Sequence, residues 1–304
     1  MTEDADIALA RHTLKAIPLL ANYDGPVVRL GGLTNLVFRL GDYCLRIPGR
    51  GTEEYIDRVN EMMATEAVAR AGVGPEVLFA DAASGVFVSR FIEGAVTMSP
   101  ESFLISAGAP ARAGKAFRKL HDSGAVFPAR FELFSMIDSY LGVLSTKDVA
   151  LPAGYHEVLK GAEGVRAALF AHPLPSVACH CDPLCENFLD TGERMWIVDW
   201  EYSGMNDPMW DLGDLCIEGG FGPEQEEEMI RAYFGGEPTP AERGRITIYK
   251  AMCDLLWTLW GLIQLANDNP VDDFRVYADS RFARCRALMQ TDAFADAVST
   301  VAMG

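Results

Sequence analysis

The sequence has few basic residues for its length. Lys and Arg together number 26, against 43 Asp and Glu, so the formal net charge is -17. A surface of this sign repels the phosphate backbone of nucleic acids and attracts small cations. We therefore expect no nucleic-acid partner, and the charge favours a small cationic ligand.

Targeting and membrane-spanning segments are also missing. The first 15 residues, MTEDADIALARHTLK, are acidic where a signal peptide has a basic start. The most apolar segment, residues 251–266, contains Asp254 and falls short of the roughly 20 residues that cross a bilayer. We expect this segment to be a buried helix, the protein not to insert into membranes, and its location to be the cytoplasm.

The cysteines lack the spacing of a disulfide framework. There are seven in 304 residues, an odd number, which favours free thiols in a reducing compartment. Three of them fall in the segment CHCDPLCEN at 179–187, which allows two interpretations. One is a zinc site made of Cys179, His180, Cys181 and Cys185. The other places the chemistry on Asp182 and Asn187, between the thiols.

The spacing of this segment argues against zinc. C-x-C followed by three residues and a further Cys is not a zinc knuckle, and no second Cys/His pair follows at the usual distance. We therefore expect His180 to be a packing and hydrogen-bonding residue of a loop. His121, in KLHDSG, has the same expected role at a helix end.

The first third of the chain alternates strand-like runs with turns. PVVRL, NLVFRL and YCLRIPG precede a helical pattern over residues 53–72, and EVLFAD and GVFVSRFIEG follow it. This order predicts a small antiparallel sheet carrying one helix. From about Thr97 onward helical patterns dominate, at residues 111–124, 130–144, 156–172 and 251–266. We predict an α+β protein with an N-terminal lobe at 1–93 and a larger, mainly helical lobe at 94–304.

One hairpin interrupts the helical part. NFLDTGERMWIVDW reads as two short strands joined at the turn Asp190-Thr191-Gly192. This fold brings Asp199 back beside Asn187, with Asp182 on the preceding loop and Glu201 close by. Carboxylate and amide oxygens are the ligands that Mg²⁺ prefers. If the metal carries a nucleotide, Asp182 is left to accept a hydroxyl proton.

These residues carry a family resemblance. His180-x-Asp182, Asn187 and Asp199, with the predicted N-terminal lobe, resemble the catalytic loop and metal-binding Asp of the kinase-like superfamily that includes aminoglycoside phosphotransferases. The turn GGLTNLVFRL and Arg46 on the third strand look like the choline/ethanolamine kinase family. The resemblance implies a bilobal protein-kinase-like fold, with ATP and Mg²⁺ as cofactors.

The resemblance also implies roles for individual residues of the nucleotide site. The turn over the ATP phosphates would comprise Gly31, Gly32, Thr34 and Asn35. Arg46 would hold phosphate oxygens and pair with a helix Glu, for which Glu61 fits the family spacing better than Glu66. Ser89 and Phe91 would lie in the hinge that meets adenine. Asn187, Asp199 and Glu201 would hold the metal, with Asp182 and Arg46 as the catalytic residues.

A second signature lies in the helix DLLWTLWGLIQ. Tryptophans at helical spacing are more often core residues, but the similar helix of choline kinases lines the pocket for the quaternary ammonium. The resemblance therefore assigns Trp257, Trp260 and Tyr277 to an aromatic acceptor pocket. Asp211, Asp214 and Glu218 recur at i, i+3 and i+7 and predict an acidic helical face. By the resemblance, Asp211 would brace the catalytic loop and Glu218 would face the substrate cation.

The leading prediction is an ATP-dependent choline kinase. Ethanolamine, thiamine or an aminoglycoside are alternative acceptors on the same fold, although the Trp-rich helix argues against an aminoglycoside. A different class of function is a non-catalytic kinase-like binding module. Loss of Asp182, Asn187 or Asp199 would mark such a module, and all three are present.

Overall fold

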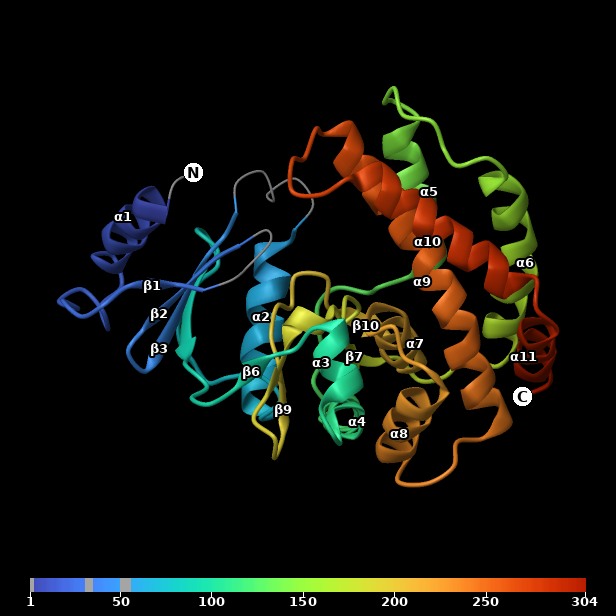
Figure 1. The fold of residues 1–304 in the computed structure, drawn as a ribbon, viewed down its shortest axis with the longest axis horizontal. Helices are drawn as coiled ribbons and strands as arrows, with labels where there is room; N and C mark the ends of the chain where they lie inside the picture. Colours follow the sequence, from blue (N-terminus) through green and yellow to red (C-terminus); the bar gives the residue numbers. More distant parts are fainter. Residues whose placement is uncertain (1–2, 31–34, 50–55) are drawn as a thin grey trace.

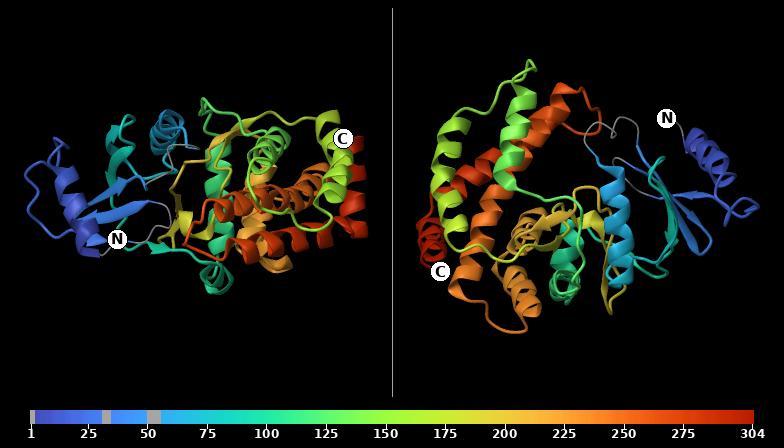
Figure 2. Two further views of the ribbon diagram at one scale, coloured as in Figure 1. Left: turned by 90° about the horizontal axis from the view of Figure 1, so that it is seen from above. Right: turned by 180° about the vertical axis from the view of Figure 1, so that it is seen from behind.

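The computed structural model describes residues 3–30, 35–49 and 56–304. A small sheet-rich part, with helix α1, lies at one end of the molecule and a larger helical part, with helix α11, at the other (Figures 1 and 2). This arrangement confirms the predicted α+β, two-lobed fold. The expected division after residue 93 falls between strands β5 and β6.

The small part is built on a five-stranded antiparallel sheet in the order β1-β2-β3-β5-β4. Its strands are β1 (Val28–Arg29), β2 (Leu36–Leu40), β3 (Tyr43–Ile47), β4 (Val77–Asp81) and β5 (Val86–Arg90). Phe38, Leu40 and Leu45 are fully buried on one face, as period-two alternation in half-buried strands requires. The predicted strands are therefore present in the predicted order.

Helix α1 (Glu3–Leu14) covers this sheet and was not predicted. Its Ala10 and Leu14, with Ile17 and Leu20 beyond its end, join Phe38 in the core of the small part. Few apolar residues mark its inner face, so the sequence pattern alone gave a weak helical signal.

Helix α2 (Arg58–Arg70) stands between the sheet and the helical part (Figure 1). Asp57 caps its first turn by accepting hydrogen bonds from the Val59 and Asn60 amides. Ala64 and Val68 pack into the core of the larger part, so this helix connects the two parts.

The larger part consists mainly of helices. They are α3 (Pro100–Ile105), α4 (Ala109–His121), α5 (Leu133–Leu144), α6 (Tyr155–Ala171), α7 (Met209–Glu218), α8 (Pro223–Phe234), α9 (Pro240–Ala266), α10 (Phe274–Met289) and α11 (Asp292–Met303). Helix α9 starts 11 residues before the predicted segment, at a capping box formed by Thr239 and Glu242. By length and composition α9 could cross a membrane, but 78% of its apolar window is buried inside the fold. That burial is the mark of a core helix, as predicted.

Two short sheets, separate from the five-stranded sheet, contain the predicted hairpin and the strand that leads into the CHCDPLCEN segment. Strands β6 (Val96–Thr97), β8 (Phe188–Asp190) and β9 (Met195–Ile197) form one, and β7 (Val177–Cys179) pairs with β10 (Gly204–Asn206) in the other. The pairing of Phe188 with Ile197 sets the register of the predicted hairpin. A 3-10 turn at Cys185–Asn187 leads into β8.

Candidate active site

The loop after β7 is fixed by hydrogen bonds from its backbone. The amides of His180 and Cys181 donate to the two oxygens of Asp211, both at 2.8 Å. The Asp182 amide faces His180 Nδ1 at 3.3 Å, and His180 Nε2 lies 2.9 Å from the Val198 carbonyl. Because Nδ1 accepts, Nε2 carries the proton and donates to Val198. His180 therefore joins the Asp182 loop to the residue before Asp199, and burial lowers the pKa of its imidazole.

Two residues that the sequence did not single out for the site support Asp211. His121, the last residue of α4, is buried, with Nε2 3.0 Å from Asp211 Oδ2 and Nδ1 2.9 Å from the Tyr233 hydroxyl. Its position at a helix end is as expected. Its contact with Asp211 depends on the packing of α4 against α7 and α8.

The hairpin brings Asn187 and Asp199 together. The Val198 amide donates to the Asn187 carbonyl at 2.9 Å, and Asn187 Nδ2 donates to the Asp182 carbonyl at 3.1 Å. This bond engages the donor side of the Asn187 amide and leaves Oδ1 as the atom suited to a cation. Asp199 adopts a φ of 65°, a conformation that non-glycine residues rarely take outside functional or turn positions.

Asp199 has an oxygen suited to a metal. Its Oδ1 is buried and has no hydrogen-bond partner among the described residues. Burial, together with the nearby charge of Glu201, raises the Asp199 pKa to about 7. A buried carboxylate with an unpartnered oxygen is stable in its charged form only if a cation lies close to it. The oxygen donors of Asn187 and Asp199 therefore fit Mg²⁺.

A charge cluster adjoins this site. Arg46 Nη2 lies 2.7 Å from Glu61 Oε1 and also contacts Glu201. Arg58 Nη1 lies 2.7 Å from Glu61 and 2.8 Å from Glu201. Glu66 instead pairs with Arg70 on the surface, so Glu61 is the helix Glu beside Arg46.

Glu201 accepts three hydrogen bonds that the sequence did not predict. Its Oε1 accepts hydrogen bonds from Arg46, Arg58 and, at 3.0 Å, Asn35 Nδ2. The carboxylates of Glu61, Asp199 and Glu201 offer ligand atoms within 4.8 Å of one another. Glu201 is thus both a neighbour of the metal position and the partner of two arginines.

The remaining nucleotide-site residues fall into two groups. Gly31, Gly32 and Thr34 lie outside the described residues. Ser89 pairs with Cys44 in the sheet, and the Phe91 amide donates to the Asp42 carbonyl at 2.8 Å. The adenine contact at this segment remains a prediction.

Four aromatic side chains cluster near the Asp182 loop. Trp260 Nε1 donates to the Tyr202 hydroxyl at 3.0 Å, and the Tyr202 and Trp257 rings meet edge to face at 5.6 Å. Tyr277 packs on Trp260 with ring centroids 5.7 Å apart. The predicted residues Trp257, Trp260 and Tyr277 are therefore brought together, and Tyr202 is an addition that only the structure reveals.

Acidic groups surround this aromatic cluster. Burial raises the pKa of Asp182 well above its ordinary value, and the charges of Glu218 and Asp199 add to the effect. Asp214 Oδ2 accepts a hydrogen bond from Trp257 Nε1 at 3.3 Å. Glu218 forms an ion pair with Arg281 at 2.5 Å through one of its two oxygens, and its expected role of facing a substrate cation stays a prediction.

The side chains of CHCDPLCEN point to different partners. Cys179 Sγ lies 3.7 and 3.8 Å from the carbonyls of Asn206 and Asp207, and Cys185 Sγ lies 3.5 Å from that of Glu218. The ring of His180 faces Val198. All seven cysteines are free, as expected. The residues of the rejected zinc interpretation do not converge on one point.

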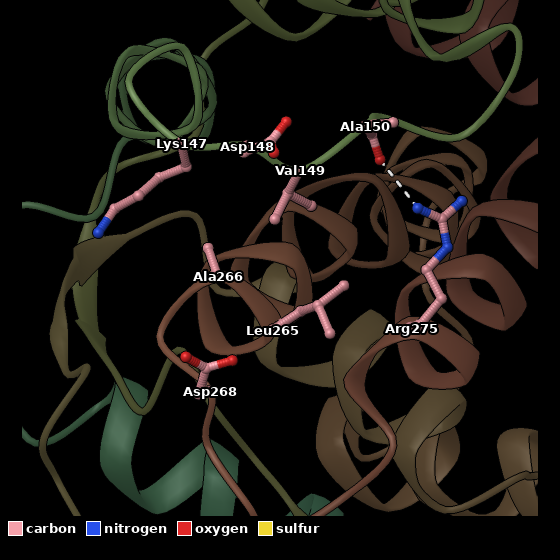
Figure 3. Close-up of a pocket in the computed structure, with 8 residues that line it drawn as sticks. All are labelled: Lys147, Asp148, Val149, Ala150, Leu265, Ala266, Asp268 and Arg275. Carbon is pink, nitrogen blue, oxygen red and sulfur yellow. Dashed lines mark hydrogen bonds between the residues drawn. The ribbon is translucent and has the colours of Figure 1, made fainter.

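A separate hollow of about 420 Å³ lies where the α5–α6 connection meets the C-terminal end of α9 (Figure 3). Lys147, Leu265 and Arg275 contribute to its wall, and the Arg275 guanidinium donates to the Ala150 carbonyl at 2.9 Å. None of its lining residues is a predicted site residue.

The Asp182 loop lies within a segment that matches a known protein family. Residues 27–245 match the model of APH, the phosphotransferase enzyme family. The chain belongs to this family. The matched range contains the Asp182 loop, the Asn187–Asp199 hairpin and the Arg46–Glu61 pair.

Solved structures show which phosphotransferases the chain is similar to in sequence and fold. A choline/ethanolamine kinase family protein from Mesorhizobium loti is 70% identical, with a TM-score of 0.93 over 98% of this chain and 100% of that one. Choline kinase LicA from Streptococcus pneumoniae is 25% identical, with a TM-score of 0.77 over 92% of this chain and 98% of that one. The resemblance to the choline/ethanolamine kinases is confirmed.

The chain is also similar to a protein described as an ethanolamine kinase. A probable ethanolamine kinase from Arabidopsis thaliana is 26% identical over 281 residues, 80% of this chain and 73% of that protein. The chain is therefore a choline/ethanolamine kinase-like phosphotransferase, a small-molecule kinase that uses a nucleotide and a small alcohol.

Proposed function

We propose that this phosphotransferase transfers the terminal phosphoryl group of ATP to the hydroxyl of a small cationic alcohol, with choline as the leading acceptor. The observation that carries the proposal is the aromatic cluster of Tyr202, Trp257, Trp260 and Tyr277, surrounded by carboxylates, next to Asp182. Aromatic faces attract a cation that has no N–H to donate, at about 0.5 to 2 kcal/mol per contact. The negative charge of the whole chain adds long-range attraction.

Asp182 would accept the hydroxyl proton of the acceptor. Its loop is held by Asp211 and His180, and the charges of Glu218 and Asp199 help to raise its pKa. A raised pKa makes a carboxylate a better proton acceptor near neutral pH. Positioning by the loop supplies much of the remaining rate in phosphoryl transfer.

Asn187 and Asp199 would hold Mg²⁺, with Glu201 as a third carboxylate. Bound Mg²⁺ supplies positive charge to the nucleotide phosphates and fixes their geometry. Arg46, kept in place by Glu61, would offset phosphate charge from the other side. Asn35 stays near this position through its bond to Glu201.

Ethanolamine is the nearest competing acceptor, because relatives of both kinds match the chain. Methyl groups in an apolar pocket discriminate by only about 1 to 3 kcal/mol each, so the preference is a matter of degree. Thiamine and aminoglycosides are larger. Tyr277 packs directly against Gly261 of α9, where an added Cβ would lie 2.6 Å from the ring.

A coupled ADP-release assay with ATP and Mg²⁺ tests the proposal. The panel comprises choline, ethanolamine, thiamine and an aminoglycoside, each with and without EDTA. We expect acceptor-dependent ADP release that EDTA abolishes, with the highest kcat/KM for choline. Absence of ADP release with choline, from protein that binds ATP, would overturn the choline proposal.

A further inference from the structure

Asn60 ties helix α2 to the larger part of the protein. It lies in the first turn of α2 and is 4% exposed. Its Nδ2 donates to the Ser203 carbonyl at 2.9 Å, and its Oδ1 accepts from the Ala129 amide, also at 2.9 Å. Both ends of this buried side-chain amide are therefore satisfied by backbone groups of the larger part, one of them 143 positions away in the sequence.

The two partners of Asn60 are themselves joined by hydrogen bonds near β10. The Met205 amide of β10 donates to the Ala129 carbonyl at 2.9 Å. Ser203 directly precedes β10 and follows Glu201 by two residues. The side chain of Asn60 therefore fixes the start of α2 against the segment that carries Glu201.

The C-terminal end of α2 is bonded to the same part of the protein. The Gly72 carbonyl accepts hydrogen bonds from Lys119 Nζ of α4, at 2.8 Å, and from the Arg194 guanidinium of the β8–β9 turn. The Ile197 amide of β9 donates to the Val73 carbonyl at 3.1 Å. Helix α2 is therefore fixed to the larger part at both of its ends.

Arg46 reaches the two carboxylates of this assembly from the small sheet. It lies on β3, and its guanidinium contacts Glu61 of α2 and Glu201. Glu61 directly follows Asn60, and Glu201 lies two residues before Ser203, the partner of Asn60. The hydrogen bond between Asn60 and Ser203 therefore sets the separation of the two carboxylates that receive Arg46. A functional side chain is held precisely when its own partners are fixed in this way.

We propose that Asn60 is a positioning residue of the nucleotide site. It keeps Glu61 and Glu201 at the spacing that directs Arg46 toward the ATP phosphates. This inference rests on the role proposed above for Arg46, and the effect of Asn60 on nucleotide binding is carried by that guanidinium. A purely structural Asn60 would lower the stability of the fold and leave the nucleotide affinity of the folded protein unchanged.

Isothermal titration calorimetry of the whole chain, with Mg²⁺ and the non-hydrolysable β,γ-imido analogue of ATP, tests the proposal. Asn60→Ala is introduced into wild-type protein and into Arg46→Met protein, in which Arg58 still pairs with both carboxylates. We expect the dissociation constant to rise at least about fivefold in the first background and less than about twofold in the second. The effect disappears in the second because the guanidinium through which Asn60 acts is absent.

Tyr155→Phe is the matched control. It removes a buried hydrogen bond of 2.9 Å, from the Tyr155 hydroxyl on α6 to the Leu255 carbonyl on α9. The loss should lower the stability of the fold. It should leave the dissociation constant of the ATP analogue unchanged, because neither residue contacts α2 or the Arg46 cluster through this bond.

An equal rise in both backgrounds, or no rise in wild-type protein, would overturn the inference. An equal rise for Tyr155→Phe would also overturn it, because the effect would then follow from lost stability. Urea unfolding checks the fold of each variant, and Asn60→Ser and Arg46→Gln provide the same comparison if the first variants do not fold.

The titration also separates this inference from the proposed function. If Arg46→Met binds the ATP analogue as tightly as wild-type protein does, the phosphate role of Arg46 fails and the inference fails with it. The titration contains no acceptor, so absence of ADP release with choline would overturn the proposed acceptor alone.

Discussion

Replacing Asp211 by Ala should destabilise the protein and slow it. The substitution removes both acceptors of the His180 and Cys181 amides, at a position with 0% exposure. Each buried N–H left without an acceptor costs about 1 to 3 kcal/mol, so the free energy of unfolding should fall by about 2 to 6 kcal/mol. The loss of the His121 contact adds to this.

Asp211→Asn provides a graded comparison. Asp211 Oδ2 serves both the His180 amide and His121, and Oδ1 serves the Cys181 amide. An amide oriented with its oxygen at the Oδ2 position keeps two of these bonds and loses one. We expect a cost of about 1 to 3 kcal/mol, roughly half that of the Ala variant.

Urea unfolding measures the stability of both variants, and ADP release measures their turnover. Because Asp182 follows the braced segment directly, a shift of about 1 Å in the loop should lower kcat about 100-fold. Asp122→Ala is the control, since its pair with Arg118 is solvent-exposed and should contribute less than about 1 kcal/mol. A loss below about 1 kcal/mol for Asp211→Ala would refute the assignment of Asp211 as the brace of the loop.

Three further predictions concern the same segment. Asp182→Asn should lower kcat by about 10² to 10⁴-fold while ATP binding and folding persist, and near-normal turnover would remove Asp182 from the mechanism. Burial lowers the pKa of His180 below 6.5, so the unfolded chain binds more protons and this group costs up to about 1.4 kcal/mol of stability per pH unit below 6.5. Urea unfolding of His180→Gln at pH 7 and pH 5 should show a smaller loss on acidification than wild type, and equal losses would contradict the assignment. Changing Cys179, Cys181 and Cys185 together to Ala should lower stability but keep Mg²⁺-dependent transfer, whereas loss of metal dependence in folded protein would restore a role for the thiols.

Local patterns in the sequence were enough to predict much of the architecture. The strand runs and turns of the first third predicted the small sheet, and the turn at Thr191-Gly192 predicted the hairpin that places Asp199 beside Asn187. These features depend on residues close in sequence, where alternation and turn chemistry act directly. Helix α1 was missed because its few apolar residues have meaning only against the sheet that they cover.

The sequence by itself determined the order of the strands in the small sheet, the Asp182, Asn187 and Asp199 spacing, and the presence of tryptophans and acids on two helices. Only the tertiary structure decided which of those acids enter an ion pair. Arg281, 63 positions from Glu218, engages that carboxylate, whereas Asp214 keeps an oxygen without a partner among the described residues. Spacing along one helix fixes the face on which an acid lies. The ion pair that neutralises it comes from another helix, whose approach depends on the packing of the whole core.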